Sequence, residues 1–319
     1  MPFWKKESAE EKDNRQLREQ EQIASLAALE SGRVPLHAEQ RLSEQAGNAG
    51  FFTSNLTTNE HLLSRHASFE PLGQVMGSSF FKVAYSSYAT GMFQSTGELR
   101  ALTEAQLSSR TLALSRLRQE AEILGAHGVI GVRLVRREHD WSNNVVEFTA
   151  IGTAVRLKGA AGQKSAELFT SALSGQEFWK LHEAGYLPVE IAYGVCSYYI
   201  HSDMQTNMVL NNSWGSGMTN QELVQYTAGF QTARNIAMTR FSHEVKRVKA
   251  QGAVGVKIDW DCEEIEYEVN DNRYVDLLVH FTALGTAIAA RPDRVTAGTT
   301  TLTFLDLKDR GSFQFPLKE

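Results

Sequence analysis

The two cysteines, Cys196 and Cys262, are the residues of this sequence best suited to hold a soft metal. Carboxylates of the acidic run 259–268 surround Cys262 and would allow a mixed thiolate and carboxylate site. A structural zinc site needs about four convergent ligands, and no Cys-x-x-Cys or closely spaced histidine pair accompanies either thiol. Two unrelated buried cysteines, and an acidic run that forms a solvated strand and turn, are therefore the preferred interpretation. We expect well under one equivalent of zinc, copper or nickel per chain.

Sequence motifs for catalysis are missing. The chain has no Gly-x-Ser-x-Gly, no phosphate-binding loop and no His-Glu-x-x-His. A Gly-x-x-Gly pattern occurs at 128–131 and again at 252–255, but each follows a predicted helix and begins a predicted strand. A dinucleotide fingerprint has the reverse order, after a strand and before a helix. We therefore predict no enzymatic activity, no catalytic residues and no cofactor.

Composition and charge favour a globular protein of the reducing cytoplasm. The 319 residues are 42% hydrophobic with a net charge of −5, which argues against nucleic acid as the main partner. No apolar run approaches the roughly 20 residues of a membrane helix, and two cysteines do not suggest a disulfide framework. The start, Phe3-Trp4-Lys5-Lys6, is not a secretory signal. It could make a weak membrane-surface contact, although a flexible terminus is the preferred interpretation.

The chain carries one module twice. Phe52-Thr53-Ser54 recurs as Phe169-Thr170-Ser171, and Glu98-Leu99 recurs as Glu222-Leu223. Two helix arginines and a closing strand are also repeated: Arg110 as Arg234, Arg116 as Arg240, and 148–155 as 281–288. The second copy contains two insertions, near 208–217 and near 263–273, where the composition favours loops. A duplicated fold is expected.

Each module is predicted to contain a strand, a long helix and two more strands. In the first copy these are 71–85, 98–125, a strand from 129 to about 138, and 145–157. Ala113, Leu117 and Ala121 lie on one face of the helix, which must pack on a sheet to be buried. The sequence therefore predicts an α+β fold in which one helix covers a small, mostly antiparallel sheet.

Several glycines are expected to be structural. Glycine is predicted to end each long helix, since it readily adopts positive φ, and Gly77 is predicted to mark a bulge or a close backbone approach. Replacing Gly128 with valine should cost about 1 kcal/mol or more if its φ is positive. The full set is Gly77, Gly125, Gly128, Gly131, Gly152, Gly194, Gly252, Gly255 and Gly285.

The predicted domains follow from this organisation. A helical extension and linker, 1–50, precede the modules at 51–160 and 168–290, and a tail with a possible extra strand covers 291–319. Within the extension a charged helix is expected over 5–31, docking only near its end if at all, and a short helix over 38–45.

The modules resemble the YbjQ-like proteins, a family often labelled heavy-metal-binding. The resemblance rests on Val75-Met76-Gly77, on the helix exit from Leu124 to Arg133, and on Gly152-Thr153-Ala154-Val155. The second copy is similar at Tyr193-Gly194 and at Gly285-Thr286-Ala287-Ile288. The resemblance implies a β-α-β-β module that assembles into rings, typically pentamers. It transfers no catalytic residues.

Two classes of function follow. The first is a non-enzymatic scaffold or interaction protein that forms a ring of copies of itself, five chains holding ten modules, because one helix covers only one face of each sheet. The second is a metal-binding or small-ligand-binding protein that uses the same oligomer. The client protein of the scaffold is not evident from the sequence.

Overall fold

The computed structural model describes residues 9–47, 52–83, 95–139, 142–158, 168–211, 220–269 and 272–291. The expectations for Phe3, Trp4, Lys5 and Lys6, and for an extra strand beyond residue 291, lie outside these ranges. The helices are α1 (Ala9–Glu30), α2 (Leu36–Gly47), α3 (Thr58–His66), α4 (Arg100–Ile123), α5 (Gly175–Glu183), α6 (Met204–Leu210) and α7 (Val224–Arg247). The strands are β1 (Phe69–Lys82), β2 (Gly97–Glu98), β3 (Gly128–His139), β4 (Ser142–Leu157), β5 (Phe169–Thr170), β6 (Tyr186–Ile200), β7 (Gly252–Val269) and β8 (Asn272–Ala290).

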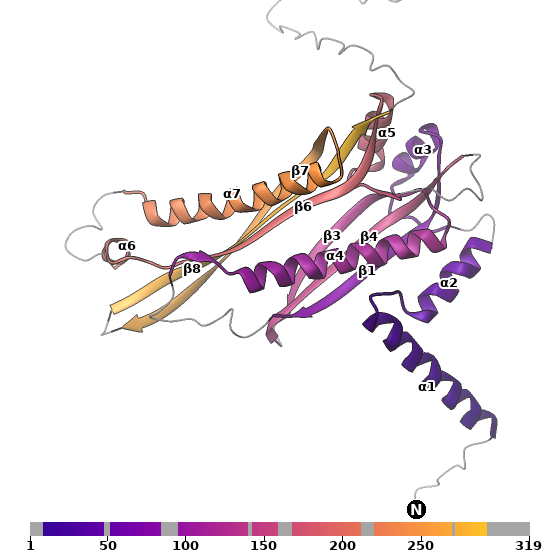
Figure 1. Cartoon of the computed structure of the whole chain (residues 1–319), viewed down its shortest axis with the longest axis horizontal. Helices are drawn as coiled ribbons and strands as arrows, with labels where there is room; N and C mark the ends of the chain where they lie inside the picture. The colour runs from indigo at the N-terminus through magenta and orange to yellow at the C-terminus, as the bar shows by residue number, and fades with distance from the viewer. Residues whose placement is uncertain are drawn as a thin grey trace, which may run out of the picture.

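The predicted α+β fold is confirmed. Two four-stranded sheets have the strand orders β1-β4-β3-β5 and β2-β6-β8-β7, and the long strands within each sheet are antiparallel. Helix α4 packs on β1 and β4, and helix α7 packs on β6 and β8 (Figure 1). Val75, Leu117 and Phe148 lie in the core beneath α4, where each has no more than a trace of exposed surface.

The helices approach their sheets very closely at two repeated glycines. An added Cβ at Gly77 would lie 2.0 Å from the carbonyl oxygen of Ala113, and one at Gly194 would lie 2.0 Å from that of Ala237. No other residue type fits such a contact without moving the helix. Of the two alternatives for Gly77, close approach is the one observed, since the irregularity in β1 lies between Pro71 and Gly73.

The helix exits differ from the prediction in the second copy. Gly125 ends the first helix with φ +68°, but Lys249 takes the same place after α7 with φ +53°. The expectation that glycine ends both helices was therefore wrong, because a single left-handed residue suffices and a lysine can supply it at some cost. Gly128 does not have positive φ; instead, a Cβ there would lie 2.3 Å from the Phe169 ring.

The insertion near 263–273 is not a loop. It lengthens the hairpin of β7 and β8, whose pairing continues from Gly252 opposite Ile288 to Val269 opposite Asn272. The acidic run 259–268 lies within β7, so its members alternate along a strand. The insertion near 208–217 begins within the last turn of helix α6, which ends at Leu210.

Several short elements were not predicted from the sequence. Helices α3 and α5 each begin with a capping box, Thr57 with Glu60 and Ser174 with Glu177, and they lie against each other. The N-terminal extension docks on the first module, since Leu42 of α2 is completely buried in its core. Among the described helices, none is long and apolar enough to cross a membrane.

Candidate functional site

The two modules exchange short strands. Strand β2 precedes helix α4 of the first module but pairs with β6 of the second, Gly97 lying opposite Tyr199. Strand β5 begins the second module but pairs in parallel with β3 of the first, Phe169 lying opposite Gly128. Each sheet is thus completed by its neighbour, and the module interface is the best-defined site for an interaction protein.

The first half of the interface is formed by the start of helix α4 on the edge of β6. The Leu99 amide donates to the Ser197 carbonyl at 2.9 Å, and the Ser197 amide donates to the Thr103 hydroxyl at 3.0 Å. Arg240 of α7 donates to Glu98 at 2.5 Å and to the Val195 carbonyl at 2.8 Å. The hydrogen bond from Arg240 to Glu98 raises the pKa of the Arg240 guanidinium, so the ion pair stabilises the charged form.

Helix α4 also covers the face of the second sheet that α7 leaves open. Figure 1 shows α4 running between the two sheets, and Ile191 of β6 belongs to the hydrophobic core of the first module. Arg110 donates to the Thr282 hydroxyl at 3.0 Å and lies 4.7 Å from the centroid of the Phe148 ring. Burial lowers the pKa of Arg110 to about 9. The cation is held by an aromatic ring and a hydroxyl group.

The second half of the interface is formed by the segment 169–173 on the edge of β3. The Ser171 amide donates to the Val129 carbonyl at 2.8 Å, and the Val132 amide donates to the Ser171 carbonyl at 2.9 Å. The Phe169 ring covers Gly128, which leaves room for it by having no side chain. Phe169 packs edge-on against Phe69 of β1 with centroids 5.8 Å apart.

A cleft of about 510 Å³ lies between the modules. Its charged lining is balanced, with Arg110, Arg133, Arg136 and Lys257 facing Glu60, Glu177, Asp259 and Asp261. The Nε and Nη1 atoms of Arg110 have no hydrogen-bond partner in the described part of the chain, but they have almost no accessible surface and a ligand in the cleft would not reach them. The cleft therefore offers room for a small molecule without a clear preference for its charge.

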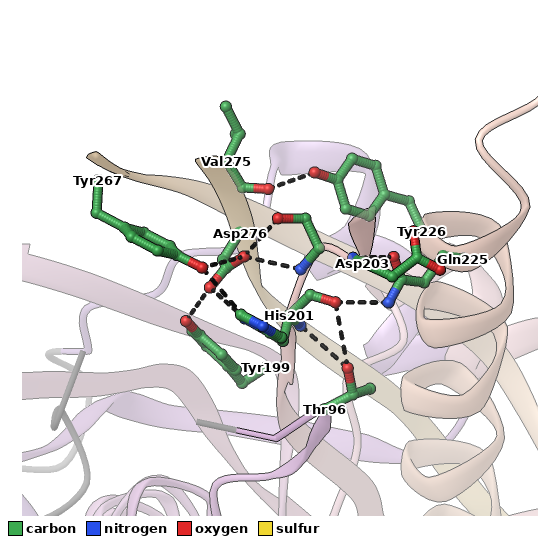
Figure 2. A network of polar contacts seen from close by, with 10 residues as sticks. Thr96, Tyr199, His201, Asp203, Gln225, Tyr226, Tyr267, Val275 and Asp276 are labelled. Atoms are coloured by element: carbon green, nitrogen blue, oxygen red, sulfur yellow. Dashed lines mark hydrogen bonds and ion pairs between the residues drawn. The ribbon is translucent and has the colours of Figure 1, made fainter. Parts of the chain in front are cut away.

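A buried carboxylate organises the far end of the second module. Asp276 of β8 accepts hydrogen bonds from the Ser202 amide at 2.8 Å, from the His201 ring at 3.0 Å and from the Tyr199 hydroxyl (Figure 2). Burial opposes ionisation of this carboxylate, but these hydrogen bonds outweigh it and lower the pKa of Asp276. Asp276 is thus a fully buried charge whose acceptor sites are occupied.

This network also holds the exchanged strand. The His201 amide donates to the Thr96 hydroxyl at 3.0 Å, and Thr96 immediately precedes β2 (Figure 2). Gln225 of α7 donates to the His201 carbonyl at 2.6 Å. Asp276, His201 and Thr96 therefore connect the second module to the strand that the first module supplies, which is a structural role.

The cysteines do not converge. Cys196 is buried on β6, Cys262 is exposed on β7, and strand β8 lies between them. Burial, followed by the nearby Glu98, raises the pKa of the Cys196 thiol to about 12, which disfavours the thiolate that a metal requires. In the part of the chain that the structure describes, no group of three or more His, Cys, Asp or Glu side chains is arranged to hold a metal ion.

Comparisons with known proteins identify the family. The model of a family described as "Putative heavy-metal-binding" matches residues 56–158. The encapsulin nanocompartment protein Rv1762c of Mycobacterium tuberculosis is 36% identical over 249 residues, which cover 75% of this chain and 90% of that protein. The chain belongs to the YbjQ-like family.

Other relatives in the YbjQ-like family are single-module proteins in length. A UPF0145 protein of Enterococcus faecalis is 32% identical over 105 residues, which cover 96% of it but 32% of this chain. A UPF0145 protein of Pseudothermotoga lettingae is 30% identical over 105 residues, with the same shares covered. No solved structure matches the chain significantly. The tandem arrangement is thus a feature of this chain relative to those proteins.

Proposed function

We propose that the protein is a non-enzymatic scaffold that assembles with copies of itself. The observation that carries this proposal is the strand exchange, which completes only one side of each sheet. Among the described residues, no strand pairs with the outer edge of β1 or of β7. Long unpaired strand edges readily accept a further strand, and here both lie on modules that already bind one another through such edges.

The relatives support this proposal. The Mycobacterium tuberculosis relative is named as an encapsulin nanocompartment protein, and none of the relatives reported above is named as an enzyme. We further propose that the assembly is a ring of five chains holding ten modules. We also propose that the protein is located in the cytoplasm. The unpaired state of both cysteines supports a reducing compartment.

A second candidate is a small-ligand or metal-binding protein that uses the same oligomer. The cleft of about 510 Å³ between the modules favours it, since that volume suits a small molecule. Elemental analysis of purified protein separates the two candidates: at least one bound metal per chain would promote the second candidate above the first.

Light scattering coupled to size-exclusion chromatography tests the scaffold. At micromolar concentration we expect a mass that is a multiple of 35.5 kDa. A stable species of 35.5 kDa would overturn the proposal.

A further inference from the structure

The residues that join the two modules within the chain are repeated on its outer surfaces. On the side of the interface formed by α4, Glu98, Leu99 and Thr103 recur as Glu222, Leu223 and Thr227. On the side formed by β5, Phe169, Thr170 and Ser171 recur as Phe52, Thr53 and Ser54. The residues of the internal interface make their contacts within the chain. Four of their counterparts are exposed: Glu222, Thr227, Phe52 and Thr53.

The surfaces that receive these residues are repeated as well. Arg240 donates to the Val195 carbonyl and to Glu98. Its counterpart Arg116 donates to the equivalent carbonyl, that of Ser78, at 2.6 Å, but it has no carboxylate partner among the described residues. Burial alone lowers the pKa of Arg116, whereas the bond to Glu98 raises that of Arg240.

The glycine at the start of the inner strand shows the same contrast. Gly128 is covered by the Phe169 ring, but no atom of the described residues lies within 4 Å of a Cβ added at its counterpart Gly252. Phe52, the counterpart of Phe169, is 41% exposed. Val132 is 3% exposed beneath the segment 169–173, whereas its counterpart Val256 is 41% exposed. Each receiving position on the second module therefore lacks the cover that the first module has.

The outer face of the first sheet carries two exposed apolar side chains. Met76 and Phe80 of β1 are 48% and 58% exposed. Their counterparts Tyr193 and Ser197 lie under α4, since Tyr193 packs against the core of the first module and Ser197 is fully buried. A helix equivalent to α4 would cover Met76 and Phe80 in the same way, and α7 is that helix.

We infer that a second copy of this chain occupies these surfaces, and that it binds head to tail by repeating the module interface. Glu222 of one copy pairs with Arg116 of the next, and Phe52 of the next copy covers Gly252 of the first. Both outer edges, β7 of one copy and β1 of the next, are closed by a single contact. Such a contact is heterologous, so repeated addition closes a ring or extends a filament. This inference rests on the proposed function and specifies its partner surface.

A charge exchange tests the ion pair. In Glu222→Arg every intermolecular contact would bring two arginines together, and in Arg116→Glu it would bring two glutamates together. We expect each variant to weaken assembly at least about tenfold in light-scattering titrations, and the double variant Glu222→Arg with Arg116→Glu to recover most of it. Glu21→Arg, on an exposed part of helix α1, is the matched control and should assemble like the wild type.

Engineered cysteines test the strand contact independently of charge. Thr170 lies opposite Val129 within the chain, so Thr53 of one copy should lie opposite Ala253 of another. With Cys262→Ser as background and a mild oxidant, Thr53→Cys with Ala253→Cys should give disulfide-linked multiples of 35.5 kDa on a non-reducing gel. Val129→Cys with Thr170→Cys, the same pair inside the chain, should react without a change in mass.

The outcomes separate this inference from the proposed function. If the wild type is an oligomer, but the charge variants assemble normally and only the Val129 and Thr170 pair reacts, the head-to-tail contact is wrong and the scaffold survives. If the wild type is a 35.5 kDa monomer, both are wrong. Recovery in the double charge variant together with linked multiples supports the contact.

Discussion

Replacing Gly128 with alanine should destabilise the fold at the module interface. The added Cβ would lie 2.3 to 2.4 Å from three atoms of the Phe169 ring, which is too close for any real contact. The ring has little freedom to move, because Phe69 packs on it edge-on and Phe178 is stacked on it with centroids 5.9 Å apart. Either β5 must shift away from β3 or the aromatic cluster must repack.

The expected loss follows from two opposing contributions. Overpacking a well-filled core costs about 1–3 kcal/mol. Replacing glycine with alanine returns about 0.4–1 kcal/mol, because it makes the unfolded chain less flexible. The net loss in the free energy of unfolding is therefore about 1–2 kcal/mol. For 319 residues that corresponds to a fall in melting temperature of roughly 1.5–3 °C.

Thermal and urea unfolding of Gly128→Ala, beside Gly252→Ala as the matched control, provide the assay. Within one chain, none of the residues that the structure describes has an atom within 4 Å of a Cβ at Gly252, so alanine there should leave the monomer unchanged or slightly more stable. An unchanged melting temperature in Gly128→Ala, or equal losses in the two variants measured at dilutions that prevent assembly, would refute the reasoning.

Further predictions concern the buried carboxylate, the close helix approaches and the thiols. Asp276→Asn should lower the free energy of unfolding in urea by about 2 kcal/mol at pH 7. Because folding lowers the pKa of Asp276, the stability difference between wild type and variant should shrink as pH falls below about 4. A constant difference down to about pH 2.5 would contradict this role. Gly77→Ala and Gly194→Ala should each cost about 2 kcal/mol or more, since the added Cβ meets helix backbone, and melting curves like the wild type would contradict the packing. Cys196→Ser with Cys262→Ser should leave the oligomer intact and metal content well under one equivalent; stoichiometric metal that is lost together with oligomerisation would contradict this.

The repeated module could be predicted from the sequence because its signals are local. The stripe of Ala113, Leu117 and Ala121 predicted a helix buried on one face, and the apolar strands around it predicted an antiparallel sheet. The close approach at Gly77 was one of two alternatives that a glycine inside a strand suggests. These features depend on side-chain periodicity within one element, which survives in a single sequence.

The strand exchange could not be predicted from the same signals. Strands β2 and β5 are two residues each, so they carry no periodicity, and their pairing partners lie in the other module. The recurrence of Phe52-Thr53-Ser54 as Phe169-Thr170-Ser171 was a usable signal, because it extends the duplication beyond the predicted helix and strands. The long β7 and β8 hairpin was missed for another reason: its polar and acidic composition resembles a loop, while its backbone is paired from Lys257 opposite Leu284 to Val269 opposite Asn272.

The surroundings of Asp276 show what duplication alone leaves out. Asp276 lies near the start of β8, in the lengthened hairpin, and its partners come from β6 and from the segment that follows β6. The network is therefore specific to the second module, and only the three-dimensional arrangement brings His201 and Thr96 to it.

An electron cryomicroscopy reconstruction of the purified wild-type protein tests the central claim most directly. Head-to-tail assembly predicts copies in identical environments, with the segment 221–222 of each copy beside β1 of the next and Phe52 of the next copy over Gly252. A particle in which β1 and β7 face solvent, or in which two copies meet through the same edge of each, would contradict head-to-tail assembly.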